Sequence, residues 1–324
     1  MKRDLAGRRL VVTGAARGIG EQVARIAAAR GARLALVGLE PDRLRSLAGE
    51  LGPGTVWREA DVRDGAALQA AIDRCAQVMA GVDLVVANAG VAAYGTVRQI
   101  DEASFERVVD INLNGVFRTL KYATPHLERS RGHVTVVASA LSFMPLAGMA
   151  AYGASKSAAE LLALAYRQEV AHLGVTVGLV HPSWIDTDIV RGADADLPSF
   201  GRLRSRLPYP GNVTTSVDKA ATAIVDGLVR RRSRVYVPRA VAVANWLKGA
   251  LNSPLAWPWM RRFASRAVPA LEREVEALGR NDQLVPGRGL SEKAALAAHI
   301  ITSLHLIVTS LHSRWRNAAH HLRK

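Results

Sequence analysis

The sequence predicts a doubly wound α/β fold with a parallel sheet and a mainly helical C-terminal extension. Short apolar runs rich in β-branched residues alternate with longer helical stretches over residues 1–240. Continuous apolar strands that alternate with helices are typical of a parallel sheet covered on both faces. The alternation stops after residue 240, so we expect one domain over 1–240 and a separate extension over 241–324.

The elements of the first 240 residues follow from their patterns. Helices are expected over 18–30, 41–51 and 65–79, and Pro41 suits the first helical turn because its missing N–H is not needed there. Residues 188–215 are predicted as a long irregular stretch, of the kind that often forms a mobile lid. The expected strands are 9–13, 32–37, 55–60, 83–90, 133–139, 175–182 and 234–238.

The composition limits the class of protein. The chain has 324 residues, of which 49% are hydrophobic and 22% are charged, so a large core can form and global disorder is excluded. Cys75 is the single cysteine, which excludes an intrachain disulfide and a cysteine-rich metal site. A glycine-rich loop begins by residue 14 and leaves no room for the apolar stretch of a signal peptide. We therefore expect a reducing, cytoplasmic setting.

The positive charge is concentrated near the C-terminus. The net charge is +15, and residues 230–324 carry 17 Lys/Arg against 5 Asp/Glu, which leaves a net of +3 for the rest. Such a segment can meet nucleic acid, anionic lipid or an acidic partner. We do not expect nucleic-acid binding, because no known module is recognisable and Arg230–Arg232 fits a solvated turn.

A glycine-rich loop is the first motif that carries chemistry. The segment TGAARGIG (13–20) lies between a predicted strand and a predicted helix. Glycines there allow a tight turn and a close approach to a ligand, and the following helix offers unpaired N–H groups to a pyrophosphate. Alone, such a loop can also be a simple tight turn, but its strand–loop–helix placement favours a nucleotide site.

The second motif is a tyrosine and a lysine four residues apart, Tyr152 and Lys156. On a helix this spacing places both side chains on one face. A phenol has an unperturbed pKa near 10, and a neighbouring ammonium lowers it toward the range that general acid/base chemistry needs. The alternative is a solvated helix face.

With these motifs the sequence resembles the short-chain dehydrogenase/reductase family over residues 8 to about 240. Further matching motifs are Asp61-Val62, Asn88-Ala89-Gly90, Asn112, Ser139 and the pair Pro182 and Thr187. The resemblance implies a Rossmann-fold catalytic domain that transfers a hydride between a nicotinamide and a carbonyl or alcohol carbon. It implies that Tyr152 donates or accepts the proton, Ser139 hydrogen-bonds the substrate oxygen, Lys156 binds the nicotinamide ribose, and Asn112 holds a proton-relay water.

The resemblance also implies a set of cofactor-binding residues. Asp61 is expected to accept from the adenine amino group, or else to cap a helix. Asn88 is expected to fix a loop backbone, and Thr187 to bind the nicotinamide carboxamide or to cap a helix. The full set comprises Gly14, Arg17, Gly18, Ile19, Gly20, Gly38, Asp61, Val62, Asn88, Ala89, Gly90, Tyr152, Lys156, Pro182 and Thr187.

The choice of nicotinamide cofactor depends on the end of the second strand. Relatives that use NAD usually have an aspartate where this chain has Gly38, and relatives that use NADP often have an arginine where it has Leu39. Arg17 can pair with a 2′-phosphate, whereas Glu40 can repel one or bind hydroxyls instead. We expect NADP, with NAD as the alternative. Ala87 and Ser183 are two further departures from the family pattern.

The expected substrate is a small hydrophobic carbonyl compound or alcohol, because the residues placed on the substrate side are mostly apolar. The alternative function is a non-catalytic nicotinamide sensor that uses the basic tail as its interaction surface. No metal site is expected. The residues placed on the substrate side are Leu141, Phe143, Met144, Met149, Trp184, Ile185 and Val190.

The C-terminal extension suggests a peripheral membrane contact. Residues 241–260 are apolar and rich in tryptophan, and 294–313 contain no charged side chain and show helical apolar spacing. Tryptophan suits the boundary between headgroups and acyl chains, and basic residues favour anionic lipid. The competing expectation is that these segments pack onto the domain or onto a second subunit. A homo-oligomer is also expected.

Overall fold

The computed structural model describes residues 4–207 and 209–278, and it contains the parallel sheet that the sequence predicts. Within these residues the main sheet has seven strands in the order β3-β2-β1-β4-β5-β6-β9, and every neighbouring pair is parallel. The expected strand positions are confirmed to within a few residues. The strands are β1 Arg9–Thr13, β2 Arg33–Gly38, β3 Thr55–Glu59, β4 Leu84–Ala87, β5 His133–Val137, β6 Thr176–Pro182 and β9 Arg234–Val237.

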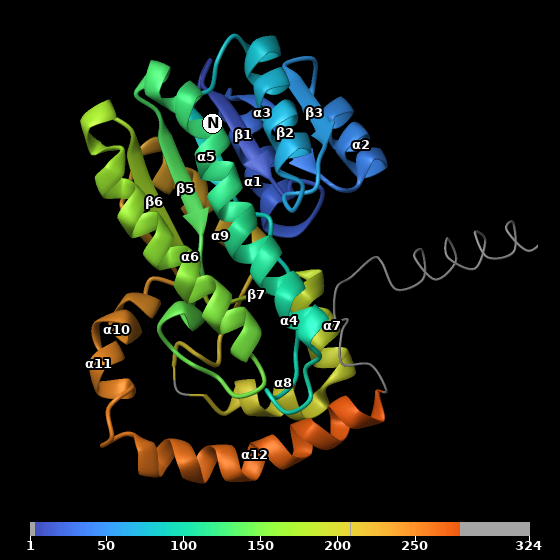
Figure 1. Ribbon diagram of the computed structural model, residues 1–324, viewed down its shortest axis with the longest axis vertical. Helices are drawn as coiled ribbons and strands as arrows, with labels where there is room; N and C mark the ends of the chain where they lie inside the picture. The colour runs from blue at the N-terminus through green and yellow to red at the C-terminus, as the bar shows by residue number, and fades with distance from the viewer. Residues whose placement is uncertain (1–3, 208, 279–324) are drawn as a thin grey trace, which may run out of the picture. The chain divides into compact units, whose positions relative to one another are not determined.

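Helices cover both faces of this sheet (Figure 1). On one face α3, α5 and α6 bury apolar side chains against alternate strand residues such as Val11, Val85 and Val136. On the other face α1, α2 and α9 pack against the intervening residues, such as Val12 and Val86. The helices are α1 Gly18–Ala29, α2 Pro41–Leu51, α3 Gly65–Met79, α4 Glu102–Val109, α5 Gly115–Ser130, α6 Ala150–Glu169 and α9 Val217–Val229.

The prediction of an irregular stretch over 188–215 is wrong for most of its length. The chain there forms α7 (Asp188–Asp196) and α8 (Pro198–Ser205), followed by a two-residue strand β8 (Thr214–Thr215) that pairs with β7 (Trp184–Ile185). The apolar residues Ala193, Leu197 and Phe200 recur at helical spacing and are buried in one cluster. That burial supplies the stability that the polar, glycine-containing sequence does not suggest.

The extension is helical where the structure describes it. It comprises α10 (Val241–Trp246), α11 (Lys248–Leu251) and α12 (Trp257–Ala277). Leu271 and Val275 of α12 are buried in the same cluster as Phe200, so this helix packs against α8. None of the helices within 4–207 and 209–278 combines the length and apolarity that a membrane crossing requires. The predicted amphipathic helix over 294–313 lies outside the described residues.

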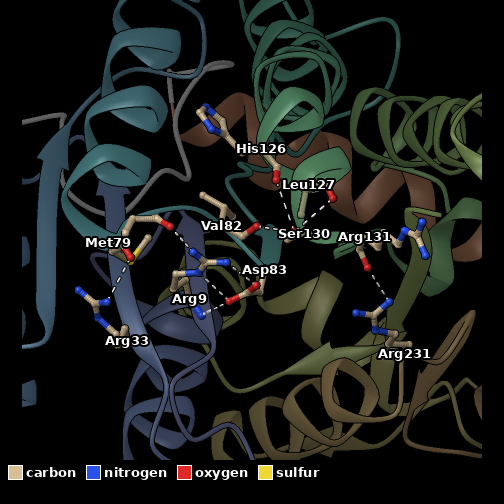
Figure 2. A network of polar contacts seen from close by, with 11 residues as sticks. Arg9, Arg33, Met79, Val82, Asp83, His126, Leu127, Ser130, Arg131 and Arg231 are labelled. Carbon is tan, nitrogen blue, oxygen red and sulfur yellow. Dashed lines mark hydrogen bonds and ion pairs between the residues drawn. The ribbon is translucent and has the colours of Figure 1, made fainter. Parts of the chain in front are cut away.

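The two edges of the sheet differ in character. At the amino-terminal edge Arg9 donates to both carboxylate oxygens of Asp83, at 2.8 and 2.7 Å, and Ser130 donates to the Val82 carbonyl (Figure 2). A cleft of about 520 Å³ beside this network is lined by Arg9 and Ser130, among others. None of the site residues that the sequence suggests lines this cleft. In a parallel α/β sheet ligands bind at the opposite, carboxyl edge.

Candidate active site

Ser139, Tyr152 and Lys156 meet beyond the carboxyl end of β5. Ser139 follows this strand and caps a short 3₁₀ turn, accepting a hydrogen bond from the Leu141 amide at 3.2 Å. Tyr152 and Lys156 lie one turn apart on α6, and the Lys156 Nζ is 5.8 Å from the centre of the Tyr152 ring. The Ser139 side chain lies close enough to the Tyr152 phenol to influence its pKa. The structure therefore brings these three predicted residues together, and Tyr152 and Lys156 do not form a solvated helix face.

Burial shifts the pKa values of both Lys156 and Tyr152. The Lys156 ammonium is 3% exposed and donates to the Val137 carbonyl at 2.8 Å, and burial lowers its pKa to about 8. Burial also raises the pKa of the Tyr152 phenol, while the neighbouring Ser139 side chain opposes that rise. The protein alone thus holds Tyr152 as a neutral phenol at neutral pH. Lowering of the phenol pKa by Lys156, which the spacing suggested, is not among its causes here.

Asn112 is fixed by a local break in helix geometry. It lies in the π-helical segment η1 (Asp110–Asn114), which joins α4 to α5. Its Oδ1 accepts from the Val91 amide at 2.9 Å, and its Nδ2 donates to the Val91 carbonyl at 2.9 Å and to Ser155 Oγ at 3.0 Å. Single π-helical turns inside helices are frequent at functional sites. Asn112 thus connects η1, the loop after β4 and the helix that carries Tyr152.

The glycine loop packs against the end of β4. Gly14 has a φ of +64°, and a Cβ there would lie 2.8 Å from the Ala89 Cα, so only glycine suits both its conformation and its surroundings. A Cβ on Gly20 would clash with the Gly14 carbonyl and lie 2.6 Å from Asn88 Nδ2. Asn88 donates to the carbonyls of Thr13 and Gly14, both at 3.1 Å. These contacts hold the loop close to the N-terminus of α1.

Arg17 immediately precedes α1, and its side chain forms an ion pair with Glu40. Its Nε donates to Glu40 Oε1 at 2.8 Å, its Nη2 pairs with Glu40 Oε2, and its Nη1 lies 3.7 Å from Asp188 Oδ2. Arg17 makes no side-chain hydrogen bond that caps the helix. Gly38 ends β2 beside this pair, and a Cβ there would lie 3.7 Å from the Ala15 amide.

The other predicted cofactor residues surround the same edge. Asp61 accepts hydrogen bonds from Arg63, whereas Asp64 is the residue that caps α3, so the helix-cap alternative for Asp61 is wrong. Val62 packs against Gly115. Thr187 precedes α7 without a side-chain capping bond. Ile19 lies within α1, and Pro182 lies at the end of β6. The backbone of Gly18 faces the Thr187 side chain, and that of Gly90 lies beside Asn112 and Lys156.

The residues at this edge fit a nicotinamide nucleotide. Glycines let the loop between β1 and α1 turn tightly against the end of β4, and the first amides of α1 have no side-chain cap. Such amides suit a pyrophosphate. Within residues 4–207 and 209–278 the Val137 carbonyl is the one hydrogen-bond acceptor of the buried Lys156 ammonium, although an ammonium has three donors. A ribose hydroxyl is a suitable further acceptor.

Comparison with known proteins decides the family. The family model described as short chain dehydrogenase matches residues 8–198. The chain belongs to the short-chain dehydrogenase family. Over 287 residues it is 30% identical to 11-beta-hydroxysteroid dehydrogenase A of Sesamum indicum, covering 86% of this chain and 80% of that protein. It is 32% identical over 224 residues to cis-4-hydroxycyclohexanecarboxylate dehydrogenase of Sinomonas cyclohexanicum, covering 67% and 90%.

A solved structure agrees with this assignment. A short chain dehydrogenase from Burkholderia cenocepacia in complex with NADP superposes with a TM-score of 0.64 at 29% identity, covering 72% of this chain and 97% of that one. This short-chain dehydrogenase is therefore an oxidoreductase with the Rossmann-like fold of the family.

Four of the seven residues predicted on the substrate side lie in one apolar cluster, which also packs against Tyr152. Of the residues predicted there, Leu141, Met149, Trp184 and Val190 lie in it. The other three predicted residues lie outside this cluster. Phe143 and Met144 pack against α10, and Ile185 belongs to the core on the face of the sheet that α1, α2 and α9 cover. The cluster also contains Ala92, Tyr94, Leu197, Phe200, Leu271 and Val275.

Sequence reasoning missed a polar network behind Lys156. Glu160, one further turn along α6, accepts from His181 at 2.9 Å and from Arg234 at 3.0 Å. Burial raises the pKa of Glu160, but the hydrogen bonds from His181 and Arg234 outweigh it and lower the pKa. The network fixes α6 to β6 and β9. The four-residue spacing of Tyr152, Lys156 and Glu160 was the signal that could have found it.

Proposed function

We propose that this short-chain dehydrogenase transfers a hydride between a nicotinamide and the carbonyl or secondary alcohol carbon of a hydrophobic substrate, with Tyr152 as general acid/base. The observation that carries this proposal is that Ser139, at the end of β5, lies beside the half-buried Tyr152 phenol, one helical turn from the buried Lys156 ammonium. A binding protein that only senses nicotinamide has no use for such an arrangement.

The side chains divide the work at the reacting oxygen. Tyr152 holds its proton at neutral pH because burial raises its pKa, so it is ready to donate to a carbonyl oxygen. The Ser139 hydroxyl is placed to hydrogen-bond the same oxygen, and Lys156 supplies positive charge one turn away. Asn112 holds the backbone of the loop after β4. The nicotinamide cofactor, when bound, supplies the hydride. This arrangement favours carbonyl reduction.

We propose NADP as the cofactor. The proposed binding residues are the glycine loop with Gly14, Gly18, Ile19 and Gly20, the residues Gly38, Asp61, Val62, Asn88, Ala89 and Gly90, and Lys156, Tyr152, Pro182 and Thr187. Arg17 supports NADP because its guanidinium lies beside the end of β2, where an aspartate is replaced by Gly38. The NADP complex of the Burkholderia cenocepacia relative also supports it. Glu40 supports the NAD alternative.

The proposed substrate is lipophilic. The cluster around Tyr152 contains Leu141, Met149, Trp184, Val190 and Leu271, and apolar walls favour apolar ligands. The Sesamum and Sinomonas relatives are named for a hydroxysteroid and a hydroxycyclohexanecarboxylate, which are both cyclic alcohols.

A spectrophotometric screen tests this proposal directly. Purified protein is mixed with NADPH or NADH and a panel of steroid, cyclic and aliphatic ketones, and oxidation is followed at the absorbance band of the reduced nicotinamide. The matching alcohols are tested with NADP and NAD. We expect turnover of a cyclic or long-chain ketone with NADPH. Binding of the cofactor without turnover of any member would favour the sensor alternative.

We also propose a homo-oligomer. Phe117 on α5 and Leu161 on α6 are exposed by 47% and 69%, which leaves an apolar surface for a second copy. Light scattering after size-exclusion chromatography measures the mass, and a monomer would contradict the proposal.

A further inference from the structure

An exposed apolar surface lies on the segment from α10 to the start of α12. We define this outer surface by Val243, Trp246, Leu247, Leu251, Leu255, Trp257 and Trp259. Trp246 is 88% exposed, Leu255 is 92% exposed, and Trp257 and Trp259 are each 57% exposed. Exposed apolar residues are normal singly, but seven of them within residues 243–259 form a group of the kind that marks an interaction site. The tryptophans are thus not buried against the domain, which was the competing expectation from the sequence.

The charges around the outer surface have one sign. From 239 to 266 the sequence contains Arg239, Lys248, Arg261, Arg262 and Arg266 and no Asp or Glu. All five are exposed, and within the described residues no ion pair engages any of them. Tryptophan and leucine bordered by unpaired arginine and lysine complement the headgroup region of an anionic bilayer.

The helices that carry the outer surface are packed against the rest of the domain at two places. On one side Val241 and Ala244 of α10 are buried against Phe143, and Asn252 donates to the Phe143 carbonyl at 3.2 Å. On the other side Leu271 of α12 is buried in the cluster that contains Tyr152. Figure 1 shows α10, α11 and α12 running along the end of the molecule where α8 lies. Through α12, the outer surface is therefore joined to the cluster that contains Tyr152.

We infer that the outer surface docks this enzyme on an anionic lipid bilayer, with its tryptophans among the headgroups and its arginines on the lipid phosphates. The inference is independent of the cofactor chosen by the enzyme. Combined with the proposed function, docking would let a lipophilic substrate pass from the bilayer to Tyr152 without crossing water.

Vesicle co-sedimentation of the full chain is the first test. Vesicles of phosphatidylcholine alone are compared with vesicles that also contain phosphatidylglycerol, at low and at high salt. We expect binding to the anionic vesicles at low salt and weaker binding at high salt, because salt screens surface charge. Protein that stays in the supernatant with anionic vesicles at low salt overturns the inference.

Matched variants assign the binding to the outer surface. The variant W246S/L255S/W259S is expected to weaken binding at least tenfold, whereas V78S/V97S, which removes exposed apolar residues elsewhere, leaves it unchanged. The variant K248Q/R261Q/R262Q is expected to bind about a hundredfold more weakly. R129Q/R230Q/R232Q removes the same charge from exposed positions at the other edge of the sheet and is expected to have much less effect. Equal effects of the two charge variants would contradict the inference.

A local probe excludes binding through another part of the chain. Cys75 is buried, and burial raises the pKa of its thiol to about 11, so an environment-sensitive fluorophore reacts selectively at an introduced cysteine. The label on Leu255→Cys is expected to shift to the blue with anionic vesicles, and the label on Val97→Cys is not. An unchanged Leu255→Cys signal overturns the inference. So does a shift that rises with protein concentration in the absence of vesicles, because it shows that a second copy covers the surface.

Discussion

Lys156 gives the most quantitative prediction, because burying its charge lowers the free energy of unfolding of the protein. The ammonium is 3% exposed, and burial lowers its pKa from 10.5 to about 8. Replacing it with methionine, a chain of similar length without charge, removes the buried ionisable group. We therefore expect Lys156→Met to be inactive and yet at least as stable as the wild-type protein at pH 7.

The expected magnitude follows from the pKa and from one hydrogen bond. One pKa unit corresponds to about 1.36 kcal/mol, so a fall from 10.5 to about 8 corresponds to about 3 kcal/mol by which burial penalises the ammonium. Lys156→Met also removes the 2.8 Å bond to the Val137 carbonyl, and a buried acceptor left without a partner costs about 1–3 kcal/mol. The variant should thus be more stable at pH 7 by roughly 0–2 kcal/mol.

The pH dependence is the sharper part of this prediction. Below pH 8 the folded and unfolded states both hold the Lys156 proton, so the penalty is complete. Between pH 8 and 10.5 the unfolded state binds more protons than the folded state, so the wild-type stability gains with pH while the variant does not. Relative to Lys156→Met, the wild-type protein should gain about 2–3 kcal/mol between pH 7 and pH 10.

Urea unfolding without cofactor, at equal protein concentrations and followed by circular dichroism, measures this difference at each pH. Lys219→Met is the matched control, because Lys219 is exposed on α9, and its difference from wild type should not change with pH. A stability difference between wild type and Lys156→Met that stays constant from pH 7 to pH 10 would refute the reasoning. So would a large loss of stability in the variant at pH 7.

Three further predictions concern catalysis and cofactor binding. Tyr152→Phe keeps the ring but removes the transferable proton, so turnover should fall by about 10² or more with an unchanged circular dichroism spectrum; near-normal turnover would exclude Tyr152 as the acid/base. Arg17→Ala should weaken NADP about ten- to a hundredfold and NAD much less, and Glu40→Gln should improve NADP relative to NAD; equal losses for both cofactors would make Arg17 structural. Gly20→Ala should weaken binding of either cofactor at least tenfold by calorimetry, because the new Cβ would clash with the Gly14 carbonyl and displace the loop. Gly49→Ala is the control: its Cβ has no atom within 4 Å, and this variant should bind the cofactor normally.

The sheet was predictable because its strands are buried on both faces. Apart from Arg9 at the start of β1, the strands β1, β4 and β5 contain only apolar residues and a few Thr or His, so each appears in the sequence as a short continuous apolar run. The helices 41–51 and 65–79 were equally clear, since each has helical apolar spacing. The convergence of Ser139, Tyr152 and Lys156 followed only from the family resemblance, because nothing in their local sequence says that two segments meet.

The parts that sequence reasoning missed depend on long-range packing. α7 and α8 contain Arg, Asp, Gly and Pro, and they form helices because Ala193, Leu197 and Phe200 are buried against Tyr94, Trp184 and α12. The partner helix α12 is about 75 residues away along the chain, as the two bonds from the Ser199 amide to the Glu274 carboxylate show. A pattern within one segment contains no information about such a partner.

The two buried charges on α6 differ in how well their hydrogen-bond partners compensate them. Glu160 is held by His181 and Arg234, so its negative charge is compensated, whereas Lys156, one turn earlier, has a single carbonyl partner in the described part of the chain. The fold therefore satisfies the charge of Glu160, whereas Lys156, the residue proposed to bind the cofactor, has fewer partners than its three donors allow. A cofactor hydroxyl that accepts from Lys156 would relieve that deficit. Cofactor binding should thus be coupled to stability through this one ammonium, in addition to the contacts that the glycine loop makes.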